Sequence, residues 1–237
     1  MVILDGEQSH SIFLLKPERE IKAILFDMDG VLVDSIPLHI KAWNSMLSEF
    51  NLPGLDQRTY LSMVGRTNLD MISNYLDLQS IPASLSFLKD IIDRKEVLLQ
   101  EIIKDHINTT PGVVAWLEFF KEKQIRCSVA SSGDMANITI VLDMLHIADY
   151  FSSIISGAHL PAGKPDPTVF ILAAASLGVK PENCLVIEDA PTGIQAAKSA
   201  DMLCFAIATT FSPAELRQAD LLLENLATVD PGTLFSD

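Results

Sequence analysis

The segment AILFDMDGVLVDS, residues 23–35, decides how this chain folds. Four apolar residues lead directly into Asp27 and Asp29, which one residue separates, and Gly30 follows them. A continuous apolar run is typical of a strand that is covered on both faces of a sheet. Two carboxylates this close repel each other. Their position after a buried strand therefore indicates a site in which a cation offsets the repulsion.

Similar apolar runs recur along the chain and alternate with helical patterns. The runs cover residues 21–27, 125–131, 151–157, 184–189 and 203–208, with a further candidate at 219–225. The helical patterns between them cover residues 113–124, 168–178 and 193–201. This alternation predicts an α/β fold with a doubly wound parallel sheet.

One long segment breaks the alternation. Residues 37–108 show only helical patterns, with Trp43 and Leu47 on one face of the first helix. The apolar residues within 88–103 predict a longer pair of helices near the end of the segment. A length of roughly seventy residues is ample for a small helical domain. We expect a core domain formed by residues 1–35 and 109–237, and an inserted helical domain formed by residues 36–108.

Composition limits the partners of the protein. The 237 residues are 49% hydrophobic, which is enough to bury a sizeable core. Lys and Arg number 17 against 31 Asp and Glu, so the net charge is −14. Such a surface repels nucleic acid and anionic membranes, and we expect neither as a partner. An anionic substrate needs a local cluster of cations or a metal. We expect a monomer.

The cysteines and the amino-terminal residues bear on location. Cys127, Cys184 and Cys204 lie in or beside apolar runs, and none belongs to a CxxC pair, which is typical of reduced core thiols in a cytoplasmic protein. The apolar patch SIFLLKP, residues 11–17, lacks the basic start and the cleavage site of a signal peptide. We expect it either to pack on the core as a short extension or to be poorly ordered.

Polar residues follow four of the predicted strands. They are Asp27 and Asp29 after the first, Ser131 after the second, Lys164 in the loop after the third, and Glu188 with Asp189 after the fourth. In open α/β sheets, sites form at the carboxyl ends of the strands. Each group also has a simpler explanation: an ordinary turn, a helix cap, a solvated lysine, or a strand end followed by a cap. A calcium loop is excluded because its twelfth position is Leu38 rather than Glu.

One reaction uses all of these groups, namely phosphoryl transfer through an aspartate. The carboxylate of Asp27 can attack phosphorus and form an aspartyl phosphate, while Asp29 can protonate the leaving oxygen and later accept a proton from water. Because two anions approach each other, the reaction needs a divalent cation, and Mg²⁺ prefers oxygen ligands. We expect the metal at Asp27, Asp189 and the backbone carbonyl of Asp29. Glu188 is a further ligand or supports one.

Lys164 and Ser131 complete this scheme. The lysine would stabilise negative charge on the nucleophile and on the phosphoryl oxygens. The hydroxyl of Ser131 would donate a hydrogen bond to a phosphoryl oxygen. Both residues are therefore candidates for catalysis and for substrate binding.

The motifs DMDGVLVDS, VASSG, GKPDP and VIEDAPTGIQAA resemble the four motifs of the haloacid dehalogenase superfamily, in particular its phosphatase and β-phosphoglucomutase-like group. The resemblance implies a Rossmann-like core with a helical cap inserted after the first motif. It also implies a nucleophile at Asp27, an acid/base at Asp29, phosphate-binding residues at Ser131 and Lys164, and metal-side acids at Glu188 and Asp189. The dehalogenases of the superfamily lack the second aspartate of the first motif, so Asp29 favours phosphate esters over carbon–halogen bonds.

Two cap residues are further candidates for substrate binding. His39 lies four residues before Trp43 on the first cap helix, where sugar phosphate members of the group carry a histidine near the acid/base. Arg66 lies in MVGRTN, residues 63–68, which resembles the substrate-specificity loop of the cap. The simpler explanation for each is an ordinary surface residue.

These observations predict a cytoplasmic, Mg²⁺-dependent phosphatase of small phosphorylated metabolites, in particular sugar phosphates. The alternative enzyme is a β-phosphoglucomutase-like sugar phosphate mutase, and a non-catalytic regulator with the same fold is the alternative from another class. In β-phosphoglucomutases we expect a lysine just before the glycine of the specificity loop and an arginine three residues after it. Val64 and Asn68 occupy those positions, which favours hydrolysis. A mutase must also bind a second phosphate on the cap, and the cap cations that could contact it are Arg66, Arg94 and Lys95.

Overall fold

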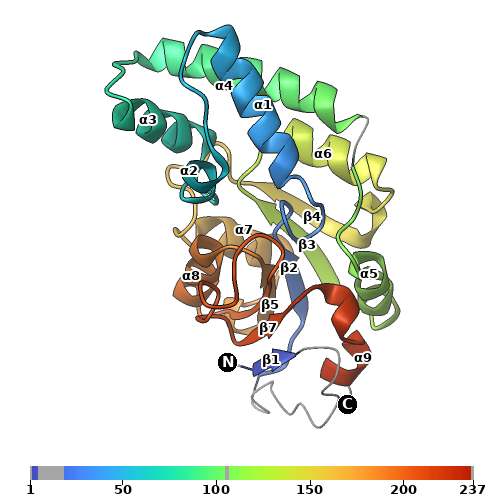
Figure 1. The fold of residues 1–237 in the computed structure, drawn as a ribbon. Helices are drawn as coiled ribbons and strands as arrows, with labels where there is room; N and C mark the ends of the chain where they lie inside the picture. Colours follow the sequence, from blue (N-terminus) through green and yellow to red (C-terminus); the bar gives the residue numbers. More distant parts are fainter. Residues whose placement is uncertain (1, 5–18, 105–106, 236–237) are drawn as a thin grey trace.

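The computed structural model describes residues 2–4, 19–104 and 107–235. A seven-stranded parallel sheet runs through it in the order β1-β7-β6-β5-β2-β3-β4 (Figure 1). The strands are β1 (Val2–Leu4), β2 (Ala23–Phe26), β3 (Arg126–Ser131), β4 (Phe151–Ser156), β5 (Cys184–Glu188), β6 (Leu203–Ile207) and β7 (Leu221–Leu223). Because β2 pairs with β3 on one side and with β5 on the other, the carboxyl ends of these three strands meet at one edge.

The sheet confirms the predicted α/β fold. Each of the six apolar runs contains a strand, including the candidate at 219–225, which holds β7. β1 was not predicted, because three residues carry too short a pattern to be recognised. The apolar patch at 11–17 lies outside the described residues.

Helices cover both faces of the sheet (Figure 1). The helices α5 (Val113–Glu122) and α6 (Met135–Met144) pack on the face that carries Ile24 and Phe26 of β2. The helices α7 (Thr168–Ser176) and α8 (Pro191–Ser199) pack on the opposite face, which carries Ala23 and Leu25. Successive residues of a strand point to opposite faces, so one continuous apolar run supplies both cores.

Shorter helical segments complete the core domain. They are the 3-10 turns Ala148–Tyr150, Pro181–Asn183 and Leu226–Thr228 and the helix α9 (Pro231–Leu234). Among the described residues, no helix combines the length and the apolar character that crossing a membrane requires.

Four helices between β2 and α5 form the cap, which stands apart from the sheet at the top of Figure 1. They are α1 (Ile36–Glu49), α2 (Gln57–Leu61), α3 (Asn68–Leu78) and α4 (Leu85–Ile103). Their apolar faces form a core of their own around Trp43, Met46 and Ile91. The predicted pair of helices at 88–103 is wrong: this segment belongs to the single helix α4, because neither glycine nor proline interrupts it. The cap limits of 36 and 108 stay a prediction.

The two chain segments that join the cap to the core lie side by side. Val33 and Thr109 form an antiparallel bridge. The backbone N–H of Thr110 donates to the carbonyl of Leu32 at 3.1 Å, and its hydroxyl donates to the carbonyl of Val31. The cap is therefore attached next to the first motif, directly over the carboxyl end of β2.

Candidate active site

Three buried carboxylates meet at the carboxyl ends of the central strands. Asp27 follows β2, Glu188 ends β5 and Asp189 follows Glu188. One oxygen from each carboxylate lies within 4.8 Å of the other two. Oδ2 of Asp189 has no hydrogen-bond partner among the described residues. A buried charge without a partner is costly, so this carboxylate cluster fits a divalent cation that takes oxygen ligands.

Lys164 links two members of the carboxylate cluster. Its Nζ donates to Oδ1 of Asp27 and to Oε1 of Glu188, each at 2.6 Å. The side chain is buried, so it is not the solvated lysine of the simpler explanation. Burial alone would lower the pKa of Lys164, but the two carboxylates raise it. The lysine therefore holds a fixed positive charge beside Asp27.

The positive charge of Lys164 does not balance the negative charges of the three carboxylates. Burial raises the pKa of Asp27 to about 7 against the opposing effect of Lys164, and the charges of Glu188 and Asp29 add to the rise. Burial, Glu188 and Asp27 also raise the pKa of Asp189 well above its usual range. A bound cation favours the ionised forms of its ligands and would reverse both shifts. The cluster is therefore short of positive charge by itself.

The carboxylate of Asp29 is held by residues at the start of the cap. Its Oδ1 accepts a hydrogen bond from the hydroxyl of Ser35 and another from Nε2 of His39, the latter at 3.2 Å. Burial alone would raise the pKa of Asp29, but His39, Ser35 and the charge of Lys95 lower it to about 2. Because this carboxylate lies outside the carboxylate cluster, any role of Asp29 in binding a metal rests on its backbone carbonyl.

The proton of the His39 imidazole can be placed from its neighbours. Nζ of Lys95 lies 3.3 Å from Nδ1 of His39. A lysine ammonium has only donors, so Nδ1 accepts and the ring proton is on Nε2, facing Asp29. His39 therefore lies beside Asp29, as predicted, while the acid/base role of Asp29 stays a prediction.

Gly30 permits the tight turn between the two aspartates and the rest of the first motif. Its φ is +80°, a conformation that favours glycine. A Cβ atom at this position would lie 1.9 Å from Oδ2 of Asp189. DMDG is therefore not an ordinary surface turn, because it brings the backbone against the carboxylate cluster.

Ser131 ends β3 as predicted. It is buried, and its hydroxyl accepts a hydrogen bond from the N–H of Gly133 at 3.0 Å. It does not cap α6, because the side chain of Asp134 does so by accepting from the N–H of Ala136. Ser131 does not line the pocket described next, whereas Ser132 does. A hydroxyl that accepts one bond can still donate another, so phosphate binding by Ser131 stays a prediction.

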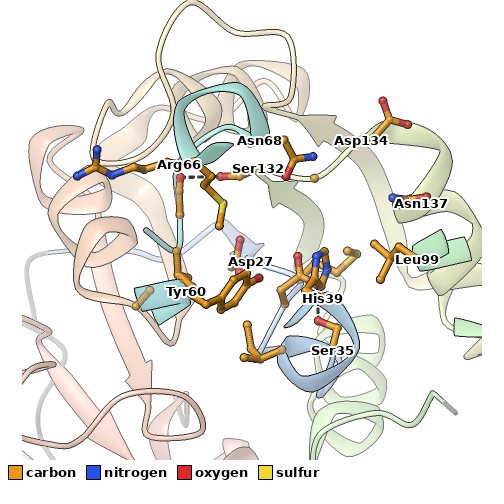
Figure 2. Close-up of a pocket in the computed structure, with 18 of the residues that line it drawn as sticks. Asp27, Ser35, His39, Tyr60, Arg66, Asn68, Leu99, Ser132, Asp134 and Asn137 are labelled. Atoms are coloured by element: carbon orange, nitrogen blue, oxygen red, sulfur yellow. Dashed lines mark hydrogen bonds and ion pairs between the residues drawn. The ribbon is translucent and has the colours of Figure 1, made fainter. Parts of the chain in front are cut away.

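A pocket lies between the strand ends and the cap (Figure 2). The cap closes over it through residues 63–68, the loop predicted to set specificity: the hydroxyl of Ser132 donates to the carbonyl of Gly65 at 2.9 Å, and that of Thr192 donates to the carbonyl of Val64 at 3.1 Å. Sequence reasoning missed Ser132, although the second serine of VASSG was the available signal.

The three cap cations take different positions. Arg66 is exposed, and its guanidinium points away from Asp27 (Figure 2). Arg94 forms an ion pair with Glu49 at 2.6 Å on the surface of the cap. Only Lys95 enters the pocket as a buried side chain, and its Nζ donates to Oε1 of Glu96 at 2.8 Å.

Comparison with known proteins places the chain in a family. A family model described as haloacid dehalogenase-like hydrolase matches residues 21–201, which is more than half of the sequence. The chain belongs to the haloacid dehalogenase-like hydrolase family. Its relatives include the phosphorylated carbohydrates phosphatase of Thermotoga maritima, 32% identical over 181 residues that cover 76% of this chain and 81% of the relative.

Other haloacid dehalogenase-like relatives are mutases. The β-phosphoglucomutase of Bacillus subtilis is 30% identical over 192 residues, which cover 78% of this chain and 83% of the relative. The crystal structure of a β-phosphoglucomutase from Clostridium difficile matches with a TM-score of 0.82 at 26% identity, over 88% of this chain and 93% of that one. The fold and the family are therefore shared by hydrolases and mutases.

Proposed function

We propose that the protein is a Mg²⁺-dependent phosphatase that hydrolyses small phosphorylated metabolites, in particular sugar phosphates, through an aspartyl phosphate. The observation that supports this most strongly is the position of Asp27. Its Oδ1 accepts from the ammonium of Lys164 at 2.6 Å, and one of its oxygens lies within 4.8 Å of an oxygen of Asp189, where a cation can bind. A nucleophilic carboxylate needs positive charge on both sides when a phosphate dianion approaches.

The donor set suits a hard cation. Asp27, Asp189 and the backbone carbonyl of Asp29 would hold Mg²⁺, with Glu188 as a ligand or as support. When bound, the ion would neutralise charge that develops between the carboxylates and the phosphoryl oxygens. Lys164 fixes the orientation of Asp27 through their 2.6 Å hydrogen bond and would contact the transferred phosphoryl group.

Asp29 would supply the proton chemistry, and His39 would support it. The pKa of Asp29, about 2, keeps this carboxylate ionised, which suits a base that accepts a proton from the water attacking the aspartyl phosphate. Its earlier role as acid requires a proton, which would come from solvent, and the hydrogen bond from Nε2 of His39, 3.2 Å long, would hold the carboxyl group in place. The two residues would therefore act as a unit.

The phosphatase named for phosphorylated carbohydrates supports a sugar phosphate substrate, while the β-phosphoglucomutases support the second candidate, a sugar phosphate mutase. A mutase must hold a second phosphate on the cap side, where a dianion needs cationic partners. Lys95 is already paired with Glu96, and Arg66 points outward. We therefore favour hydrolysis.

Two assays test the proposal. Hydrolysis of an aryl phosphate in the presence of Mg²⁺ separates the enzyme from a non-catalytic regulator, and we expect release of free phosphate. Supplying β-glucose 1-phosphate with a trace of the 1,6-bisphosphate separates phosphatase from mutase. We expect free phosphate and little glucose 6-phosphate. Rapid conversion to glucose 6-phosphate without phosphate release would instead establish the mutase.

A further inference from the structure

The side of the pocket away from the strand ends is built from an acid and two amides. Glu96 comes from α4, Asn68 begins α3, and Asn137 comes from α6 of the core. All three line the same pocket as Asp27, and Figure 2 shows both asparagines. Sequence analysis assigned none of them a function. We call these three residues the distal wall.

Hydrogen bonds hold the carboxylate of Glu96 in place. Oε1 accepts from Nδ2 of Asn68 at 2.6 Å and from Nζ of Lys95 at 2.8 Å, and Oε2 accepts from Nδ2 of Asn137. Burial alone would raise the pKa of Glu96, but Lys95, His39 and Asn137 lower it, so the group is ionised. A carboxylate offers about four acceptor sites, and three are taken, so one remains for a ligand hydroxyl.

Among the described residues, no uncommitted cation lines the pocket near this wall. Outside the carboxylate cluster and its partner Lys164, the lining residues with acidic or basic side chains are Asp29, His39, Arg66, Lys95, Glu96 and Asp134. Lys95 is compensated by Glu96, and the guanidinium of Arg66 points out of the site. A second phosphate or a carboxylate on the substrate would therefore meet the negative charge of Glu96 without a partner, which is strongly unfavourable.

We propose that the distal wall is a subsite for the uncharged, hydroxyl-bearing end of a phosphomonoester, and that Glu96 excludes substrates with a second anionic group at that end. The proposal rests on the proposed phosphatase function. Glu96 is the residue that sets specificity, because it accepts from a hydroxyl and repels a carboxylate. The two asparagines position it from both domains.

The test compares two substrates of nearly equal shape. Glucitol 6-phosphate ends in a hydroxymethyl group at the carbon farthest from the phosphate, and 6-phosphogluconate ends in a carboxylate at the same carbon. We expect kcat/KM to be higher for glucitol 6-phosphate by about tenfold or more in the wild-type protein with Mg²⁺. This ratio needs no variant, so it does not depend on whether a substituted chain folds.

A substitution then tests whether Glu96 causes the preference for glucitol 6-phosphate over 6-phosphogluconate. Glu96→Gln removes the negative charge and frees Lys95, so we expect the ratio to fall by about tenfold or to reverse. Glu101→Gln is the matched control, because Glu101 is exposed on the same helix and does not line the pocket. We expect it to leave the ratio unchanged. A purely structural effect of Glu96→Gln would slow both substrates equally and leave the ratio unchanged, which would overturn the proposal.

Hydrolysis of p-nitrophenyl phosphate distinguishes a failure of the subsite from a failure of the phosphatase function. If this phosphate is hydrolysed and the wild-type ratio is near one or favours 6-phosphogluconate, the distal wall is not the proposed subsite and the phosphatase stands. If none of the three phosphates is hydrolysed in the presence of Mg²⁺, both the phosphatase function and the subsite are overturned.

Discussion

Nε2 of His39, on the first cap helix, lies 3.2 Å from Oδ1 of Asp29 in the core. Lys95 contacts the opposite nitrogen of the same ring at 3.3 Å. The ionisation of Asp29, the proposed acid/base, thus depends on two cap helices, α1 and α4. Movement of the cap relative to the core would therefore change the proton affinity of Asp29 as well as access to the site.

Removing His39 should show that the pKa of Asp29 depends on the cap. His39→Ala removes a hydrogen bond that lowers the pKa of Asp29, so that pKa rises. We expect kcat to fall by about ten- to a hundredfold and the acidic limb of the kcat–pH profile to move to higher pH. Lys41→Ala, an exposed residue of the same helix, is the control. A profile that falls without moving would show that His39 does not act through Asp29.

Asp27→Asn should stop turnover. The change keeps the shape of the side chain and removes the carboxylate that attacks phosphorus, so we expect a loss of about a thousandfold or more in kcat. The circular dichroism spectrum should not change, because burial already disfavours the charge of Asp27, as its raised pKa shows. Near wild-type turnover in the variant would exclude this residue as the nucleophile.

Chelation should abolish activity, and Mg²⁺ should restore it. Asp189→Ala removes one of the three buried carboxylates of the cluster, so we expect the affinity for Mg²⁺ to fall by about tenfold or more. Ser131→Ala should change it far less, because this hydroxyl contacts the N–H of Gly133. Titration of activity against Mg²⁺ measures both affinities. Equal values for the two variants would remove Asp189 from the metal site.

Magnesium should stabilise the fold more at high pH than at low pH. The pKa of Asp27 in the folded protein is about 7, above its ordinary value of 3.8. Without metal, the stability linked to protonation is present below the ordinary value and is lost as pH rises toward 7. Mg²⁺ binds the ionised carboxylate, so the rise in Tm with Mg²⁺ should be larger at about pH 8 than at about pH 5. Asp27→Asn should reduce the difference, and equal rises at both pH values would contradict this linkage.

The strand-end residues were predictable because a parallel sheet places them by its topology alone. β2, β3 and β5 are neighbours, so whatever follows Phe26, Ala130 and Ile187 must gather at one edge. Lys164 was predicted from its place in the loop after the third strand, but its contacts were not. No local pattern shows that a loop lysine folds back to 2.6 Å from Asp27.

The distal wall could not be predicted from the sequence, because it depends on how the cap and the core meet. Glu96 and Asn137 lie on helices of different domains and become partners only through packing. The position of Lys95 in the sequence pattern indicated a buried site, but this feature was overlooked. Lys95 occupies the apolar stripe of α4 between Ile91 and Leu99, and a charged residue at such a position indicates a buried partner or a site.

The junction at Val33 and Thr109 bears on how the cap could be replaced during evolution. The two segments that join the cap to the core are hydrogen-bonded to each other at this junction. These bonds hold the two ends of the insertion together and do not involve the residues between them. The entropy of closing a loop depends only weakly on its length, so an insertion of different size or shape can replace the cap at little cost to the core. Modules exchanged at this one junction would bring new molecules to Asp27 while the residues at the strand ends remain in place.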